Sequence, residues 1–143
     1  AYGLAGLRVG YGLASHPELV NLLNRVRTPF NINRSAQAAA VVALGDQQHV
    51  NDSIALVSAQ RDMMSAQLTA LGFRVAPSCA NFLFFDCGQP AAELAQRLLC
   101  DGVIIKPWRE KGYEHWIRVS VGNEQDNQQF IRSLKRILAE DAA

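Results

Sequence analysis

The sequence is short of the residues that mark metal proteins, disulfide-rich secreted domains and nucleic-acid binders. It has three cysteines, Cys79, Cys87 and Cys100, and their spacing matches no metal-ligand set. So few cysteines, in an odd number, form no disulfide framework, and we expect buried, reduced thiols in a cytoplasmic protein. The formal net charge is only +1, which gives no reason to expect nucleic acid or an acidic membrane surface as a partner.

The sequence also lacks the side-chain combinations that make a self-contained active site. There is no Ser-His-Asp order, no metal set and no pair of carboxylates in a shared helical register. His16, His49 and His115 lie far apart in polar surroundings, so we expect surface histidines rather than catalytic bases. No apolar run approaches the roughly 20 residues that a transmembrane helix needs. By themselves, the residues present establish only an α/β binding or interaction module.

A long helical period divides the chain into two parts. From about Gln47 to Leu71 apolar residues recur every three or four positions, which predicts a helix about 35 Å long that bridges two lobes. We therefore expect residues 1–46 in a first domain, the interdomain helix over residues 47–71, and a small α+β domain over residues 72–143.

The first domain is expected to contain two helices with recognisable starts. Ser15 is a predicted N-cap and Pro17 suits the first turn of the first helix. Asn33 or Ser35 is expected to cap the second, alanine-rich helix over residues 36–44. The alanine face of this helix indicates burial, either on a sheet or at a subunit contact.

The small domain is predicted from short strands and helices in the order strand, strand, helix, strand, strand, helix. The strands are expected at residues 73–76, 81–86, 103–106 and 116–121, and the helices at residues 90–100 and from Asn123 onward. The second strand is almost wholly apolar, which is typical of a central strand. In the fourth strand the alternation places Ile117 and Val119 on one face and Arg118 on the other.

The start of the chain is rich in glycine around one arginine. Glycines at positions 3, 6, 10 and 12 surround Arg8, and residues 7–14 have a strand-like pattern that the glycines weaken. A guanidinium beside close-approaching backbone suits a phosphate or a carboxylate. The residues alone leave two interpretations open, an anion site and a structural arginine at a turn.

Arg118 is the second candidate for binding an anion. A charged residue in the middle of an apolar strand must reach solvent or meet an opposite charge. Periodicity does not decide between an outward-facing arginine on a half-exposed sheet and an anion ligand.

Three stretches of the sequence are similar to fold-type I pyridoxal-phosphate (PLP) aminotransferases, and to the histidinol-phosphate aminotransferases in particular. They are Ala-Tyr-Gly-Leu-Ala-Gly-Leu-Arg at residues 1–8, Ala-Asn-Phe at residues 80–82, and Gly-Val-Ile-Ile-Lys at residues 102–106 followed by Trp-Ile-Arg-Val-Ser-Val-Gly at residues 116–122. The resemblance extends from Ala1 to about Leu138. It implies an α/β fold, the fold-type I PLP transferase, with the C-terminal portion of the large PLP-binding domain followed by the α+β small domain.

The resemblance also implies a cofactor and a set of site residues. The Schiff-base lysine is expected immediately before Ala1, so that the chain is the C-terminal part of a longer protein and holds no catalytic residue of its own. Arg8 matches the arginine that binds the phosphate of PLP. Arg118 matches the arginine that binds the anionic group of the substrate, with Lys106 assisting and Asn81 nearby. The family implies a cytoplasmic homodimer that transfers amino groups between a small-molecule amino donor and a keto acid in histidine biosynthesis.

One position departs from the family pattern. Many histidinol-phosphate enzymes have an arginine where this sequence has Lys106, and lysine is a point charge without the bidentate fork. An aromatic amino acid aminotransferase and a phospho-amino-acid decarboxylase of the same fold therefore stay open as alternatives.

Overall fold

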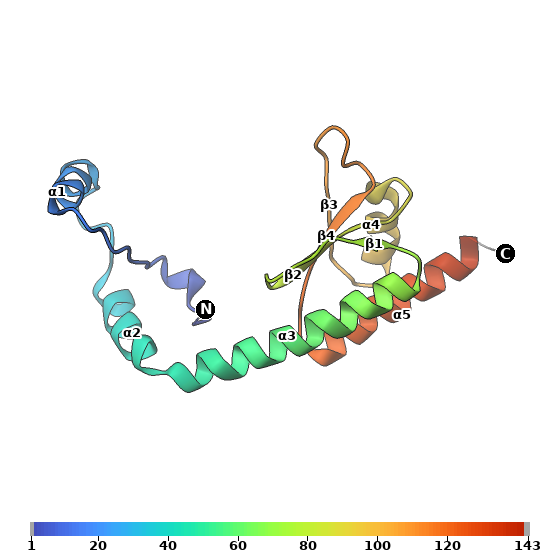
Figure 1. Cartoon of the computed structure of the whole chain (residues 1–143), viewed down its shortest axis with the longest axis horizontal. Helices are drawn as coiled ribbons and strands as arrows, with labels where there is room; N and C mark the ends of the chain where they lie inside the picture. The colour runs from blue at the N-terminus through green and yellow to red at the C-terminus, as the bar shows by residue number, and fades with distance from the viewer. Residues whose placement is uncertain (1, 142–143) are drawn as a thin grey trace. The chain divides into compact units, whose positions relative to one another are not determined.

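The computed structural model describes residues 2–141 and divides the chain into two compact units (Figure 1). One unit runs up to Ser53 and the other begins at Ile54, so the boundary lies inside the long helix α3 (Gln47–Ala70). The α/β class predicted from the sequence is confirmed. None of the described helices is long and apolar enough to cross a membrane.

The first unit consists of short helices joined by irregular backbone. It contains the 3-10 turn η1 (Ala5–Leu7), α1 (Pro17–Val26), α2 (Arg34–Gly45) and the first turns of α3. The strand predicted over residues 7–14 is not formed, because no described segment pairs with it and a ladder needs a hydrogen-bonded neighbour. Most side chains of α1 and α2 are exposed among the described residues, and the predicted burial of the alanine-rich helix holds fully only for Ala36.

Of the two N-cap predictions for this unit, the one for α2 is correct and the one for α1 is wrong. Asn33 caps α2, since its Oδ1 accepts a hydrogen bond from the Ala36 N–H at 2.7 Å. Ser15 is not the cap of α1. His16 occupies the N-cap position without a side-chain hydrogen bond, because the helix begins at Pro17, one residue later than an N-cap at Ser15 requires.

Helix α3 ends in a tight backbone turn that leads into the sheet of the second unit. Gly72 has φ +88°, and its N–H donates to the Thr69 carbonyl at 2.9 Å while the Phe73 N–H donates to Leu68 at 3.2 Å. This pair of bonds is the Schellman motif, which uses glycine because the position is left-handed.

The second unit is a four-stranded antiparallel sheet with order β1-β2-β4-β3. Its strands are β1 (Arg74–Val75), β2 (Phe82–Asp86), β3 (Lys106–Pro107) and β4 (Trp116–Ser120), and its helices are α4 (Ala91–Cys100) and α5 (Glu124–Asp141). The central position predicted for residues 81–86 is confirmed. The predicted strand over residues 103–106 is displaced, because the Val103 N–H closes the end of α4 on the Leu98 carbonyl at 3.0 Å.

One face of this sheet is packed and the other is left half-exposed. The packed face presents alternate strand residues to α3, α4 and α5, and the shared core contains Met64, Leu68, Leu83, Phe85, Leu94, Leu98, Ile117, Val119, Leu134 and Ile137. Asn123 caps α5 as predicted, with its Oδ1 accepting from Asp126 at 2.9 Å. Burial alternates along β2 and β4, so that Arg118 lies on the face away from this core.

All three cysteines are free thiols, and only one of them is buried. Cys87 is buried beside the packed face, whereas Cys79 and Cys100 are exposed. The expectation of buried thiols is therefore wrong for Cys79, in the link between β1 and β2, and for Cys100, at the end of α4. Cys79 lies in a connection and Cys100 at a helix end, and side chains at such places are commonly exposed to solvent.

Candidate functional site

Two cations face each other across the edge of the sheet in the second unit. Lys106 in β3 is the direct partner of Arg118 in β4, and Phe84 in β2 is the partner of Arg118 on its other side. Directly opposed residues project to the same face of a sheet, so the two charges share the half-exposed face. Arg118 is half-buried and Lys106 is exposed. The structure thus brings together two of the three residues predicted to bind substrate; we call Lys106 and Arg118 the two-cation site.

The two-cation site has no acidic partner within the described residues. Neither side chain forms an ion pair or a side-chain hydrogen bond there. Like charges placed directly opposite each other lower the stability of a sheet pair. A phosphate or carboxylate bound between the two cations would neutralise them and so remove this loss of stability. The pair therefore has the charge that an anion-binding site needs.

An aromatic cluster surrounds the two-cation site and was missed by the reasoning from sequence. The ring of Phe84 stacks on Trp116 at 4.7 Å between centroids and meets Trp108 edge-on at 5.4 Å, while Tyr113 lies 5.9 Å from Trp116. These rings belong to β2, β4 and the loop between β3 and β4. Only the strand register brings them together, although Phe82 and Phe84, two residues apart and so on one face of β2, were a usable signal.

Each cation of the pair lies over an aromatic ring. Arg118 Cζ is 5.2 Å from the Phe82 ring centroid, and Lys106 Nζ is 5.0 Å from the Trp108 ring centroid. Both distances fall within the range of a cation–π interaction. Arg74 also covers a ring of the cluster, that of Trp116, but it is neutralised by a 2.9 Å ion pair with Asp86.

Asn81 lies at the end of the same sheet and outside the two-cation site. Its main-chain carbonyl accepts a hydrogen bond from the Val121 N–H at 2.9 Å, which extends the pairing of β2 with β4 by one residue. The side chain is exposed and forms no hydrogen bond with another described residue. A substrate role for Asn81 stays a prediction.

Arg8, the predicted phosphate ligand, follows the 3-10 turn η1 in the first unit. Its backbone is left-handed, with φ 52° and ψ 39°, which is uncommon for a residue other than glycine. Its Nη1 donates to the Ala5 carbonyl at 2.9 Å, so the side chain folds back over its own turn. Non-glycine residues held in this conformation cost about 1–3 kcal/mol and cluster at ligand sites.

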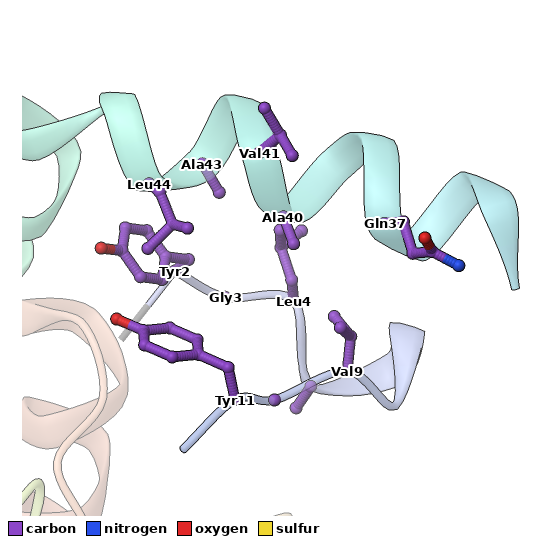
Figure 2. Close-up of a pocket in the computed structure, with 12 residues that line it drawn as sticks. Tyr2, Gly3, Leu4, Val9, Tyr11, Gln37, Ala40, Val41, Ala43 and Leu44 are labelled. Atoms are coloured by element: carbon purple, nitrogen blue, oxygen red, sulfur yellow. The ribbon is translucent and has the colours of Figure 1, made fainter. Parts of the chain in front are cut away.

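An apolar pocket lies between the start of the chain and α2 but does not include Arg8. It has a volume of about 730 Å³ and no charged side chain among its lining residues. Figure 2 shows the rings of Tyr2 and Tyr11 at one end and Gln37 at the other. Its lining offers no charged side chain to pair with an anion. The predicted anion ligands Arg8, Lys106 and Arg118 are not among the residues that line this pocket.

The perturbed titrating groups near the sheet are structural. The Gly88 N–H, donating to Asp86 Oδ1 at 3.0 Å, and Arg74 hold the pKa of the Asp86 carboxyl below its usual value. Burial raises the pKa of the Cys87 thiol, so this cysteine stays protonated and unreactive. His16, His49 and His115 are exposed, as expected.

The family model for aminotransferase class I and II matches residues 1–134. The chain belongs to this family. Its similarity to solved structures is high enough to establish the fold-type I architecture inferred from the resemblance. The histidinol-phosphate aminotransferase from Sinorhizobium meliloti, solved in complex with pyridoxal-5′-phosphate, matches with a TM-score of 0.87 and 28% identity over 97% of this chain and 39% of that one.

Two further comparisons bear on the place of this aminotransferase chain within the family. Histidinol-phosphate aminotransferase 1 from Mesorhizobium japonicum is 49% identical over 138 residues, which are 96% of this chain and 38% of the relative. The solved L-threonine-O-3-phosphate decarboxylase from Porphyromonas gingivalis matches with a TM-score of 0.79 and 26% identity, over 96% of this chain and 44% of that one. The chain thus spans less than two fifths of the curated relative.

The donor chemistry of Arg8 in this aminotransferase chain fits the phosphate of PLP. One N–H of the exposed guanidinium is bonded to Ala5, and the side chain forms no ion pair with a described residue. A guanidinium has five N–H donors, so most remain available to a doubly charged phosphate. Ala1 and the lysine expected before it lie outside the described residues. Binding of PLP by Arg8 stays a prediction.

Proposed function

We propose that the protein to which this chain belongs is a PLP-dependent aminotransferase that exchanges an amino group between histidinol phosphate and the keto acid of glutamate in histidine biosynthesis. The observation that carries the proposal is the two-cation site: Lys106 and Arg118, opposed on one sheet face, have no acidic partner among the described residues. The name of the Mesorhizobium japonicum relative supports the same substrate.

In this proposal the described residues bind and orient two anions. Arg8 neutralises the cofactor phosphate, and the remaining donors of its guanidinium fix the direction of approach. Arg118 orients the substrate through its anionic end, and Lys106 adds a second positive charge without a directional fork. When bound, PLP supplies the electron sink for the α-carbon of the substrate. The lysine that moves the proton is expected before Ala1.

The proposal extends to the assembly and location of the whole protein. We place it in the cytoplasm as a homodimer, as the resemblance implies. The three free thiols support a reducing compartment.

The test is a kinetic comparison in the full-length holoprotein. We expect Arg118→Ala to lower kcat/KM for histidinol phosphate by about 10- to 100-fold with PLP still bound, since a hydrogen bond to a charged group contributes about 1.5–3 kcal/mol. Arg132→Ala is the matched control, because Arg132 is an exposed arginine of α5 in the same unit and forms no ion pair with a described residue. Near-normal turnover of the Arg118 variant would assign Arg118 to the surface.

A second candidate is a decarboxylase that acts on a phosphorylated amino acid, favoured by the similarity to the Porphyromonas gingivalis enzyme. A two-cation site suits the phosphate of either substrate. Product analysis separates the two reactions: release of carbon dioxide without a keto product would replace the aminotransferase proposal.

A further inference from the structure

Lys106 is held by an aromatic ring two residues further along the chain. Its Nζ lies 5.0 Å from the centroid of Trp108, and Pro107 between them is paired with Ile117 in the ladder. Residues two apart in an extended segment project to the same face, so the indole lies directly in reach of the ammonium. Indole is the strongest cation–π partner among protein side chains.

The Trp108 ring is itself fixed by the sheet. The main-chain N–H of Trp108 donates to the Trp116 carbonyl at 2.8 Å. The Trp108 ring meets the Phe84 ring edge-on, and the Phe84 ring stacks on Trp116. The indole is half-buried. A ring anchored on two sides can select one orientation of a lysine whose four-carbon stem otherwise samples many rotamers.

The ring contacts direct the two cations to opposite ends of their strand pair. Lys106 leans toward Trp108, at the end of β4 that begins with Trp116, whereas Arg118 leans over Phe82, which pairs with Ser120 at the other end. The rings thus separate two charges whose backbones are directly opposed. This arrangement limits the mutual repulsion of the two charges.

We propose that Trp108 is a positioning residue that holds the Lys106 ammonium in the two-cation site. The proposal rests on the proposed function insofar as the anion is the substrate phosphate. It adds a physical reason why a lysine, which lacks a directional fork, can serve at this position: the direction is supplied by the indole face.

The contact is tested in the full-length holoprotein by NMR of the lysine side chains. We expect the Lys106 ε-methylene protons to be shifted upfield by the ring current of Trp108, to lose that shift in Trp108→Leu and to keep most of it in Trp108→Phe. Lys106→Ala assigns the signal. If these protons in the unaltered protein have the chemical shift of a solvent-exposed lysine, the positioning proposal is overturned, and the proposed reaction is not affected.

The effect on the anion is tested by binding and kinetics. We expect Trp108→Leu to raise the Kd for inorganic phosphate and the KM for histidinol phosphate by about two- to fivefold, with kcat unchanged. In a Lys106→Ala background the same substitution should change neither value, and Trp108→Phe should restore most of the loss. Tyr113→Leu is the matched control, because Tyr113 belongs to the same cluster and covers no cation among the described residues.

The outcomes separate this proposal from the proposed function. Equal effects of Trp108→Leu with and without Lys106 would show that the indole acts only on folding, and would overturn the positioning role. Alternatively, Trp108→Leu could raise the Kd for inorganic phosphate only when Lys106 is present, in a protein that does not transaminate histidinol phosphate. That result would retain the positioning role and overturn the proposed function.

Discussion

At the scale of single residues, Arg8 combines an unusual backbone with a side chain that keeps most of its donors available. A left-handed residue that is not glycine is maintained only where its surroundings compensate for it. The two bonds from Arg8 to the Ala5 carbonyl, through the main-chain N–H at 3.3 Å and through Nη1 at 2.9 Å, provide part of that compensation. The turn therefore fixes the main chain and one guanidinium nitrogen of Arg8, while the remaining N–H donors of this exposed side chain stay available.

We predict that Arg8→Ala in the full-length protein weakens PLP retention at least tenfold while the fold survives. The alanine variant loses the charge-assisted hydrogen bonds to the phosphate, each about twice as strong as a neutral one. Equilibrium dialysis against PLP, with circular dichroism to monitor the fold, measures both effects. Arg27→Ala is the control, because Arg27 is an exposed arginine just beyond α1 in the same unit. An unchanged PLP affinity would remove Arg8 from the site.

At the scale of the elements, the edge pair of β1 and β2 has its own electrostatic support. Arg74 and Asp86 are direct partners in the ladder, and their side chains form the 2.9 Å ion pair. The Gly88 N–H is the main cause of the lowered pKa of Asp86, ahead of Arg74. The carboxylate thus joins the end of β2 to the turn that follows it.

We predict that this carboxylate contributes to stability above about pH 4 and that the contribution is lost in acid. A folded pKa below the unfolded value of about 3.9 means that stability is present above that value and falls as the pH drops through the folded pKa. Urea unfolding at a series of pH values measures it. Asp86→Asn should be less stable at neutral pH, and its free energy of unfolding should fall less as the pH is lowered into the acid range. Asp62→Asn, on the exposed side of α3, should follow the unaltered protein. Parallel curves for Asp86→Asn and the unaltered protein would contradict the assignment.

The turn after β4 is held by one buried amide that also contacts α3. Asn127 donates to Gln60 Oε1 at 2.9 Å and to the Gly122 carbonyl at 3.0 Å, and its Oδ1 accepts from the Gly122 N–H at 2.9 Å. This amide fixes the exit of the strand that carries Arg118 against α3. Its burial makes all three bonds costly to lose.

We predict that Asn127→Ala lowers the free energy of unfolding by about 1–3 kcal/mol, because two main-chain groups of Gly122 lose a buried partner. Gln125→Ala is the control, since Gln125 is exposed on the same helix. Chemical denaturation measures the difference. A loss of less than 0.5 kcal/mol, roughly the effect of a surface substitution, would show that water replaces the amide.

At the scale of the whole molecule, the features predicted from sequence are those set by local periodicity and capping. The span of α3, the caps Asn33 and Asn123, and the placement of Arg118 on the strand face opposite Ile117 each depend on residues within a few positions of one another. The opposition of Lys106 and Arg118 depends on strand register, which local patterns do not specify.

Features that depend on distant partners could not be predicted. The predicted strand over residues 7–14 has no partner in the described chain, and Val103 is used to close α4 instead of starting β3. The left-handed backbone of Arg8 left no signal in the sequence, since this conformation is typical of glycine and not of arginine. Trp108 and its ring contacts emerge only from the sheet order.

The two units differ in how much core each builds from the described residues. The second unit contains a continuous core across β2, β4 and three helices, whereas Ala36 is the one buried residue among the described residues 2–53 of the first. Leu13 and Phe30 are almost completely exposed there, at 94% and 101%. A helix of ten residues such as α1 is marginal in water without tertiary packing.

We therefore predict that the 143-residue polypeptide, studied alone, protects its two units unequally from hydrogen exchange. Amides of β2, β4 and α5 should exchange slowly because exchange there requires opening of the shared core, while amides of α1 should exchange nearly as fast as in an unfolded chain. Leu134→Ala should strongly lower the protection of the second unit, since deleting a buried leucine costs about 2–5 kcal/mol of a total stability of about 5–15 kcal/mol. Leu99→Ala, at a half-exposed position of α4, is the matched control and should leave the protection in place. Equal protection of α1 and β4 would show that the first unit builds a core from contacts other than those described.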